Sequence, residues 1–355
     1  MHLLAPRVRR ALAIGSLVLT ACASDDDDDV EAAAEGALAT VDPRVPIAPD
    51  LNKGSANKLG ELSGLAASTR HPGFVWMHRD GYAADRPSRE RLYVMKVVDR
   101  KLVPFTGASG TYPTRELTFA SSVAIDNVNW EDIAIGPDVI SGAGSSLYVG
   151  DIGNNNGGRN NYQIYQLAEP DPTGASAVVR SLQATWRFAY PTSAQLAGGG
   201  YPNCEVLFYL DRNLYIVTKE SQPRVYRFPD GFHARPGVRH TLVPVTNGAT
   251  TRVVGAIGKP SYGSFSGDRK RFVLGGHGRF AVYTLAAGAL RGDDLVRAML
   301  LTPGRRPAFV HEVSNVTKPA LNTEGATFEA GTHDLLLGTE SKMVFHWPRA
   351  NVEAP

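Results

Sequence analysis

The sequence predicts an all-β fold, a β-propeller of five blades with four antiparallel strands each. A short pattern, in which Ser or Glu heads an apolar run, recurs at intervals of 68, 74, 56 and 63 residues. Repeats of this length stack on their neighbours, because a single unit cannot bury its own hydrophobic face. The five copies begin at Ser63, Glu131, Glu205, Ser261 and Glu324.

Two further apolar runs follow the opening of each copy. They are rich in Val, Ile, Leu, Tyr and Phe and are separated by Gly, Pro and Asp, a pattern typical of antiparallel strands joined by turns. The second run begins at Phe74, Leu147, Leu214, Phe272 and Leu335. The third run carries the pairs Leu92-Tyr93, Ile164-Tyr165, Val225-Tyr226, Val282-Tyr283 and Val344-Phe345. No amphipathic helix of useful length is expected after residue 38.

A fourth, outer strand is expected in each blade. The candidates are Lys101–Phe105, Ala184–Phe188, His240–Pro244 and Arg297–Leu301. Little chain follows Trp347, so we expect a strand between Leu38 and Ile47 to complete the last blade and close the ring. The connections from a third strand to the next copy span 35 to 41 residues, which holds one strand and its loops. Six blades remain the alternative if one copy is degenerate, and a β-sandwich would not explain so regular a repeat.

Residues 1–21 have the pattern of a bacterial lipoprotein signal peptide. Three arginines near the start precede the apolar stretch Ala11–Ala21, which is too short to span a bilayer comfortably. The stretch ends in Leu19-Thr20-Ala21-Cys22, where cleavage would leave Cys22 as a lipidated N-terminus. An ordinary secretory signal cleaved nearby is the alternative. We therefore expect attachment to a membrane through Cys22, on the periplasmic face of the outer membrane or on the cell surface.

Residues 22–38 are expected to form a tether and residues 39–355 the propeller. The tether contains Asp25–Asp29, five adjacent carboxylates that repel one another and stay solvated. Cys204 lies inside an apolar run and would lack a disulfide partner if Cys22 is lipidated, so we expect it to be a buried small hydrophobe. The formal net charge of +2 gives no case for nucleic-acid binding. We expect a monomer.

The residues that open the five copies should converge on one axis, because the first strand of every propeller blade lines the central channel. Three of them are glutamates, and like charges in a narrow channel raise one another's pKa. A hard divalent cation would relieve this repulsion, and Ca²⁺ is favoured over Mg²⁺ because it accepts six to eight oxygen ligands. Zn²⁺ is not expected, because no His or Cys joins the ring. The predicted metal ligands are Ser63, Glu131, Glu205, Ser261 and Glu324, and a column of channel waters is the alternative.

The order Ser, Glu, Glu, Ser, Glu along five blades resembles the calcium-activated nucleotidases, the apyrases of the five-bladed class. Short segments similar to the blade openings of that family occur at Glu61-Leu-Ser-Gly-Leu, Trp130-Glu-Asp, Asn203-Cys-Glu and Thr323-Glu-Gly. The match at Ser261 is the weakest. The similarity spans Gly60 to Trp347, with a few matching residues in each blade. It implies a central Ca²⁺ ringed by these residues. The chain also resembles uncharacterised secreted bacterial propellers with Trp-Glu-Asp and Gly-Asp-Ile-Gly-Asn openings.

The loops that leave the second strands should open beside the cation, because each second strand runs back toward the face where the first began. All five loops are polar, and four carry Lys, Arg or His. Such a rim would suit the oxygens of a phosphate-bearing ligand, with ordinary solvated turns as the alternative. The predicted ligand-binding residues are Arg79, Asp80, Asn154, Lys219, His277, Arg279 and Lys342.

Three functions are compatible with these features. The favoured one is a lipid-anchored binding protein whose loop face takes a small molecule or a protein partner beside a structural cation. The second is a Ca²⁺-dependent hydrolase of phosphoanhydride or phosphoester bonds, in which Asp132 or Asp151 would activate water. A glycosidase is a weaker third, because the sequence does not reveal the separation of two carboxylates. No motif singles out a catalytic residue, so enzymatic activity stays open.

Overall fold

The computed structural model describes residues 45–48, 50, 51, 59, 61–80, 90–107, 110–248, 250–254, 257–276, 278–285, 290–313 and 321–352. All of them belong to the unit Val41–Pro355. The predicted signal peptide, the tether and Cys22 lie outside the described residues, and so does His277.

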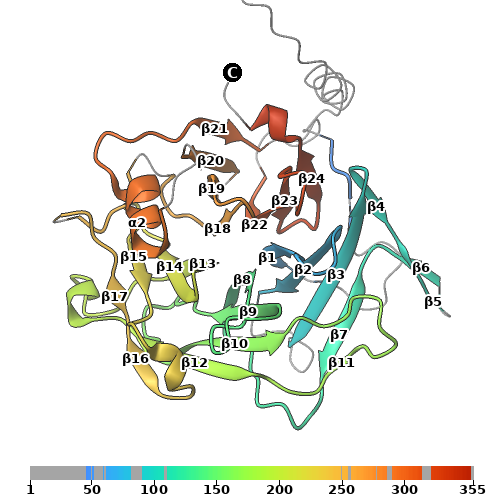
Figure 1. The fold of residues 1–355 in the computed structure, drawn as a ribbon, viewed down its shortest axis with the longest axis horizontal. Helices are drawn as coiled ribbons and strands as arrows, with labels where there is room; N and C mark the ends of the chain where they lie inside the picture. The colour runs from blue at the N-terminus through green and yellow to red at the C-terminus, as the bar shows by residue number, and fades with distance from the viewer. Residues whose placement is uncertain are drawn as a thin grey trace, which may run out of the picture. The chain divides into compact units, whose positions relative to one another are not determined.

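Five sheets surround a central axis, which confirms the five-bladed propeller (Figure 1). Blade 1 contains β1 (Leu62–Ala67), β2 (Phe74–Arg79), β3 (Arg91–Val98) and β7 (Arg115–Phe119). Blade 2 contains β8 (Trp130–Gly136), β9 (Ser146–Asp151), β10 (Tyr162–Ala168) and β12 (Ala184–Ala189). Blade 3 contains β13 (Cys204–Leu210), β14 (Asn213–Thr218), β15 (Val225–Arg227) and β17 (Val243–Pro244). Blade 4 contains β18 (Tyr262–Phe265), β19 (Arg271–Gly276), β20 (Arg279–Thr284) and β21 (Phe309–Glu312), and blade 5 contains β22 (Thr323–Phe328), β23 (Leu335–Thr339) and β24 (Val344–Trp347).

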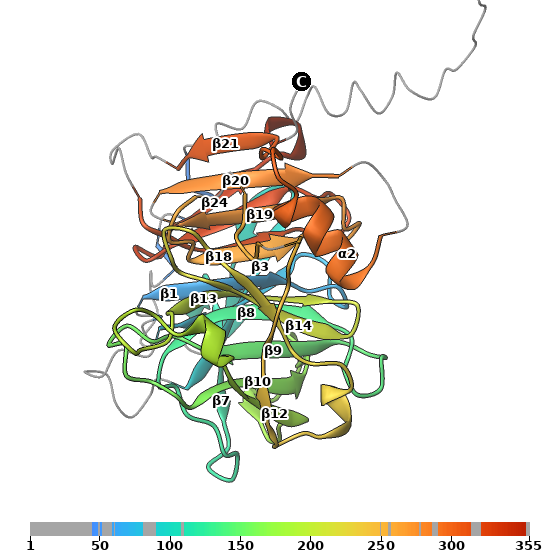
Figure 2. The same cartoon turned by 90° about the vertical axis from the view of Figure 1, so that its left-hand side faces the viewer.

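The innermost strand of each blade contacts the innermost strand of the next blade around the ring. Figure 2 shows β1, β8, β13 and β18 side by side at the centre. Strands β1 and β2 are buried along their whole length, which explains why the sequence shows continuous apolar runs instead of alternation.

Five apolar clusters fill the spaces between neighbouring blades. Trp76 and Trp130 lie in the cluster between blades 1 and 2, and Phe208 and Phe272 lie in the cluster between blades 3 and 4. Burying one large apolar side chain stabilises the fold by about 1.5–3 kcal/mol. The core therefore lies between sheets, and each blade depends on both of its neighbours.

The connection to an outer strand also covers the preceding blade. In blade 2 this connection contains β11 (Val178–Val179), which pairs in parallel with β7 of blade 1. In blade 3 it contains β16 (Arg239–Thr241), which pairs in parallel with β12 of blade 2. In blade 4 it forms helix α2 (Gly292–Val296), whose Asp293 accepts hydrogen bonds of 2.9 Å from Tyr215 and Arg227 of blade 3. These segments protect sheet edges that would otherwise stay unpaired.

The outer strands follow the prediction only in part. The strand Ala184–Phe188 is confirmed as β12, and His240–Pro244 is divided between β16 and β17. The stretch Lys101–Phe105 instead contributes to two short hairpins. Strand β4 (Lys101–Val103) pairs with β3, and β5 (Phe105–Gly107) pairs with β6 (Gly110–Tyr112). The outer strand of blade 1 is therefore β7.

The prediction was wrong for Arg297–Leu301, which forms a π-helical turn that continues helix α2. The apolar residues of α2 and this turn recur at helical spacing, and Leu295, Met299 and Leu300 are all buried. Asp293 and Asp294 lie in the first turn of α2, where negative charge favours a helix. The outer strand of blade 4 is β21 instead.

The ring closes where the N-terminal part of the chain meets blade 5. Ala48 forms an antiparallel bridge to Val344, with N–O distances of 3.3 and 2.9 Å, and Leu51 N donates to Lys342 O at 3.0 Å. The described contact thus lies just beyond the predicted segment, and residues 38–44 lie outside the described ranges. Among the described residues, no helix combines the length and apolarity needed to cross a membrane.

Candidate functional site

Three glutamates share one backbone feature, a β-bulge at the start of the innermost strand. The register of β8 with β9 skips Glu131, that of β13 with β14 skips Glu205, and that of β22 with β23 skips Glu324. A bulge leaves one residue out of the ladder and re-aims its side chain. The bulges therefore explain how three glutamates from separate blades reach one place at the axis.

Blades 1 and 4 depart from this pattern. In blade 1 the bulged residue is Gly64, with φ of +66°, and a Cβ there would lie 2.8 Å from the backbone nitrogen of Ile133. Ser63, one residue earlier, donates a hydrogen bond of 2.6 Å from its hydroxyl to the carbonyl oxygen of Glu131. In blade 4, β18 and β19 pair without a bulge and Ser261 precedes the strand. The converging carboxylates consequently come from blades 2, 3 and 5.

An axial cavity of about 130 Å³ lies where the three glutamates meet. Its buried floor and its more exposed rim are lined by Glu61, Leu62, Ser63, Asp80, Glu131, Asn155, Glu205, Lys219, Glu324 and Glu340. Ser63, Glu131, Glu205 and Glu324 are at most 8% exposed, whereas Glu61 and Asn155 are exposed at the rim. The rim residues Asp80, Asn155, Lys219 and Glu340 all lie in loops that leave second strands, as the sequence predicts for this face.

The axial cavity is strongly acidic. Six carboxylates line it, and Lys219 is the single cationic side chain among its described lining residues. The ammonium group of Lys219 bonds to the Oε2 atom of Glu205. One ammonium group could not balance six ionised carboxylates, so full ionisation would leave excess negative charge in the cavity.

This crowding shifts the pKa values of the site. Burial and the neighbouring Glu205 raise the pKa of Glu131 well above its ordinary value, and the same two causes raise the pKa of Glu324 to about 8. Burial lowers the pKa of Lys219, but Glu205, Glu324 and Glu131 outweigh it and the net shift is upward. All three shifts have the same consequence, since the site favours bound positive charge over further negative charge.

Asparagines two residues before the bulges hold two of the carboxylates. Asn129 donates a hydrogen bond of 2.7 Å to Oε1 of Glu131, and Asn203 donates one of 2.8 Å to Oε1 of Glu205. Gly153 leaves room for this arrangement, because a Cβ there would lie 2.1 Å from Oε1 of Glu131. The positions of these carboxylates thus depend on the asparagine hydrogen-bond donors and on the absence of a side chain at Gly153, in addition to the strands that carry the glutamates.

Asp132 and Asp151 do not line the axial cavity, although the sequence made them candidates for activating water. Asp132 accepts hydrogen bonds of 2.9 Å from the backbone nitrogens of Ile133 and Leu207. Asp151 is fully buried, accepts a 2.8 Å bond from Asn129 N and forms an ion pair of 2.7 Å with Arg159. Both carboxylates hold the scaffold together in this structure.

The predicted ligand-binding residues separate into two groups. Asp80 and Lys219 line the axial cavity. Asn154 is buried and instead holds its own loop, donating to Tyr201 O at 2.8 Å and accepting from Arg159 N at 2.9 Å. Arg79 is 6% exposed within β2, and Arg279 lies on β20 beside Glu312, at 3.8 Å. Arg79, Asn154, Arg279 and Lys342 are not among the described lining residues.

Several site residues were missed by the sequence reasoning. Glu61, Asn155 and Glu340 line the cavity, and Asn129 and Asn203 position its glutamates. One signal could have found the asparagines, since the triplet Asn-x-Glu occurs before each of the three bulges, at Asn129, Asn203 and Asn322.

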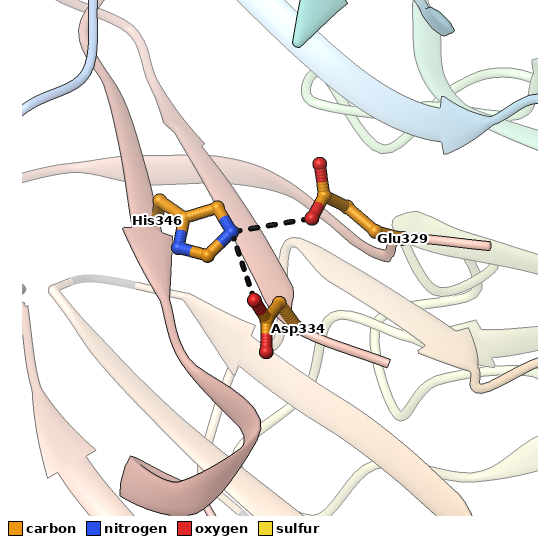
Figure 3. Close-up of side chains that lie close together, drawn as sticks. All are labelled: Glu329, Asp334 and His346. Atoms are coloured by element: carbon orange, nitrogen blue, oxygen red, sulfur yellow. Dashed lines mark hydrogen bonds and ion pairs between the residues drawn. The ribbon is translucent and has the colours of Figure 1, made fainter. Parts of the chain in front are cut away.

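A second acidic group lies away from the axis, at the edge of blade 5 (Figure 3). Potential ligand atoms of Glu329, Asp334 and His346 lie within 4.8 Å of one another, so these residues could hold a metal ion. The Nε2 atom of His346 lies 3.2 Å from a carboxylate oxygen of Glu329 and of Asp334. Arg100 of blade 1 also forms an ion pair of 3.2 Å with Asp334. With His346 protonated, two cations face two carboxylates in an ionic network, and the buried Nδ1 atom of His346 has no hydrogen-bond partner among the described residues.

Cys204 is confirmed as a buried small residue. It is fully buried in the cluster between blades 2 and 3, and burial raises the pKa of its thiol. The thiol donates to the carbonyl oxygen of Val217 at 3.3 Å. These surroundings suppress the thiolate form that a nucleophile would need.

No protein-family model and no curated protein matches the sequence. The chain is similar in fold to a gluconolactonase from Xanthomonas campestris, at 12% identity and a TM-score of 0.39 over 85% of this chain and 88% of that one. It is also similar to the hydrazine synthase of Kuenenia stuttgartiensis, at 12% identity and a TM-score of 0.36 over 81% and 71%. These likenesses concern architecture alone. The resemblance to the calcium-activated nucleotidases stays a prediction.

Proposed function

We propose that this protein is an exported, lipid-anchored propeller that holds a divalent cation, preferentially Ca²⁺, in its axial cavity. The cation would hold a ligand or partner with anionic oxygens at the rim. The observation that carries the proposal is the convergence of Glu131, Glu205 and Glu324, buried residues from three blades, on a single acidic cavity.

The donor set fits a hard cation. Every described lining side chain that could act as a ligand offers oxygen, apart from Lys219, and no His or Cys is among them. Ca²⁺ prefers such oxygen ligands, while Zn²⁺ prefers nitrogen and sulfur. Ser261 does not line the cavity, but it is 1% exposed and its hydroxyl lies beside the Glu324 carboxyl, where it lowers the pKa of Glu324. Glu131, Glu205 and Glu324 would hold the cation, which would polarise the oxygens of a bound anion.

Binding is a better proposal than turnover for this site. A hydrolase needs a base free to take a proton from water, and both candidates, Asp132 and Asp151, are engaged by scaffold donors. Phosphate release from nucleoside di- and triphosphates, measured with and without Ca²⁺, tests this choice. We expect none above the buffer rate. Ca²⁺-dependent release would replace the binding proposal with the phosphohydrolase.

The location in the cell envelope is part of the proposal. It is supported by the sequence from the arginines at positions 7, 9 and 10 to Cys22, which has the pattern of a lipoprotein signal. Replacing Cys22 by Ser should release the protein from the membrane fraction of a bacterial host into the soluble exported fraction. A Cys22→Ser protein that is cleaved at the same place and still stays in the membrane fraction would contradict the anchor, with no bearing on the cation site.

Thermal unfolding tests the cation directly. Excess Ca²⁺ should raise the melting temperature of the propeller, because a ligand that binds only the folded state stabilises it. The double variant Glu131→Gln/Glu205→Gln should lose this increase, and Mg²⁺ should produce a smaller one. A wild-type melting temperature that does not respond to Ca²⁺ would overturn the proposal.

A further inference from the structure

Lys219 occupies a position that its counterparts in the other blades do not share. In the aligned second strands, the equivalent residues are Arg79 in blade 1, Ile152 in blade 2 and Glu340 in blade 5. Arg79 and Ile152 are buried away from the cavity lining, and Glu340 contributes another carboxylate. Among these described positions, blade 3 alone supplies the cavity with a cation.

The backbone of Lys219 is held firmly at the end of β14. Its nitrogen donates a hydrogen bond of 2.9 Å to the carbonyl oxygen of Asn203, the residue whose side chain holds Glu205. The side chain is 20% exposed, so it lies between the buried floor and the open rim. A flexible four-carbon stem on a fixed backbone lets the ammonium group move outward while the loop stays in place.

We infer that Lys219 is a tethered cation that competes with the divalent cation for the axial carboxylates, and that binding of the divalent cation moves its ammonium group from Glu205 to the rim. This inference rests on the proposed function, because it assumes that a divalent cation binds at the axis. The observation that carries it is the bond between the Lys219 ammonium and Glu205, one of the three bulged glutamates.

The competition follows from charge and from the number of donors. A bound Lys219 ammonium engages the carboxylate oxygen that a metal would need, and two cations close together repel. An ammonium group offers three hydrogen-bond donors, whereas Ca²⁺ collects six to eight oxygens and carries twice the charge. The divalent cation therefore gathers the ring of carboxylates more completely.

The displaced ammonium group would create an anion site that exists only in the loaded protein. At the rim it would stand beside the bound cation, where both could contact the oxygens of one carboxylate or phosphate group. Cation binding and anion binding would then strengthen each other by the same factor. Lys219 would thus determine both the affinity for the cation and the charge of the ligand.

Calorimetric titration with Ca²⁺ alone tests the competition, using wild type, Lys219→Met and Lys219→Arg. Lys219→Met should bind Ca²⁺ about tenfold more tightly or better, because removing the resident cation removes its competition. Lys219→Arg keeps the charge and should stay near wild type or bind more weakly. The control Lys270→Met removes an exposed lysine from a blade 4 turn and should match wild type.

Thermal unfolding supplies a second readout. Without divalent cations, Lys219→Met should melt at a lower temperature than wild type, because Glu205 loses its ion pair and the described lining of the cavity loses its single cationic side chain. Ca²⁺ should then raise its melting temperature by more than it raises that of wild type.

The possible results separate the inference from the proposed function. Tighter binding in Lys219→Met with binding in wild type supports both. Equal or weaker binding in Lys219→Met, while wild type binds, overturns the role of Lys219 and leaves the cation site standing. If Lys219→Met binds Ca²⁺ and wild type does not, the competition is supported, but the proposed function of wild type as a cation-binding protein is overturned. Binding in neither protein overturns both ideas.

Discussion

Arg100 of blade 1 and Asp334 of blade 5 form an ion pair of 3.2 Å across the seam where the propeller closes. The two residues are separated by 234 positions in the chain, and their side chains are 14% and 5% exposed. A second contact to the same blade is the antiparallel bridge between Ala48 and Val344, which attaches the N-terminal part of the chain. The seam thus combines backbone pairing with a mostly buried ionic contact.

Breaking this ion pair should loosen the closure of the ring. We expect Arg100→Met to lower the free energy of unfolding by about 1–3 kcal/mol, because the mostly buried Asp334 carboxylate loses one of its two charged donors and keeps only His346. Lys101→Met, at the exposed neighbouring position, should change it by less than about 0.5 kcal/mol. Urea unfolding measures both values. Equal stability of the two variants would show that the pair does not hold the seam.

The seam should also be sensitive to pH through His346. Burial lowers the pKa of this histidine, but hydrogen bonds to Asp334 and Glu329 outweigh it and raise the pKa above the ordinary 6.5. The stabilising contribution is therefore complete below about pH 6.5 and is lost as pH rises through the raised folded pKa. The stability difference between wild type and His346→Gln should shrink along this rise in pH. Urea titrations at a series of pH values would contradict this prediction if the difference stayed constant.

The axial cavity should make the cation-free protein less stable as pH rises. Burial and Glu205 raise the pKa of Glu324 from 4.5 to about 8, so folding opposes its ionisation. A carboxyl whose folded pKa is raised stabilises the protein relatively more at low pH, and that advantage is lost between about pH 4.5 and pH 8. Glu324→Gln in the presence of a chelator should show a flatter pH profile of unfolding than wild type. Superimposable slopes would exclude this role of Glu324.

Gly153 should control the cation site without controlling the fold. In Gly153→Ala the new Cβ would lie 1.8 Å from the side-chain amide nitrogen of Asn129 and 2.1 Å from Oε1 of Glu131, so the hydrogen-bonded pair of side chains must shift. Calorimetry should show Ca²⁺ affinity reduced by about tenfold or more, which corresponds to about 1.4 kcal/mol. Gly158→Ala is a matched control, because a Cβ at Gly158, in the same loop, would meet no heavy atom within 4 Å. Unchanged affinity in Gly153→Ala would show that cation binding does not depend on the position in which Asn129 holds Glu131.

The repeat was sufficient to predict the five blades, their inner three strands and the convergence of Glu131, Glu205 and Glu324. Hydrophobic runs identify strands that are buried on both faces, and repetition places equivalent strands at equivalent positions around one axis. Sequence reasoning failed at the outer strands, where Arg297–Leu301 is as apolar as a strand but folds as a helical turn. An apolar composition indicates that a segment is buried. In a segment as short as this one, the spacing of apolar residues does not distinguish a strand from a helix.

The architecture and the three glutamates at the axis follow from the amino-acid sequence, because both repeat along the chain. Three-dimensional packing reveals which backbone bulges aim these carboxylates, that Gly64 rather than Ser63 holds the bulge in blade 1, and that Lys219 reaches Glu205. It also decided that Asp132 and Asp151 serve the scaffold, and that Arg100 meets Asp334 across the seam. No local pattern encodes these contacts, because they join residues from different strands or blades. Their distances depend on how the blades pack and on which hydrogen bonds the register leaves open.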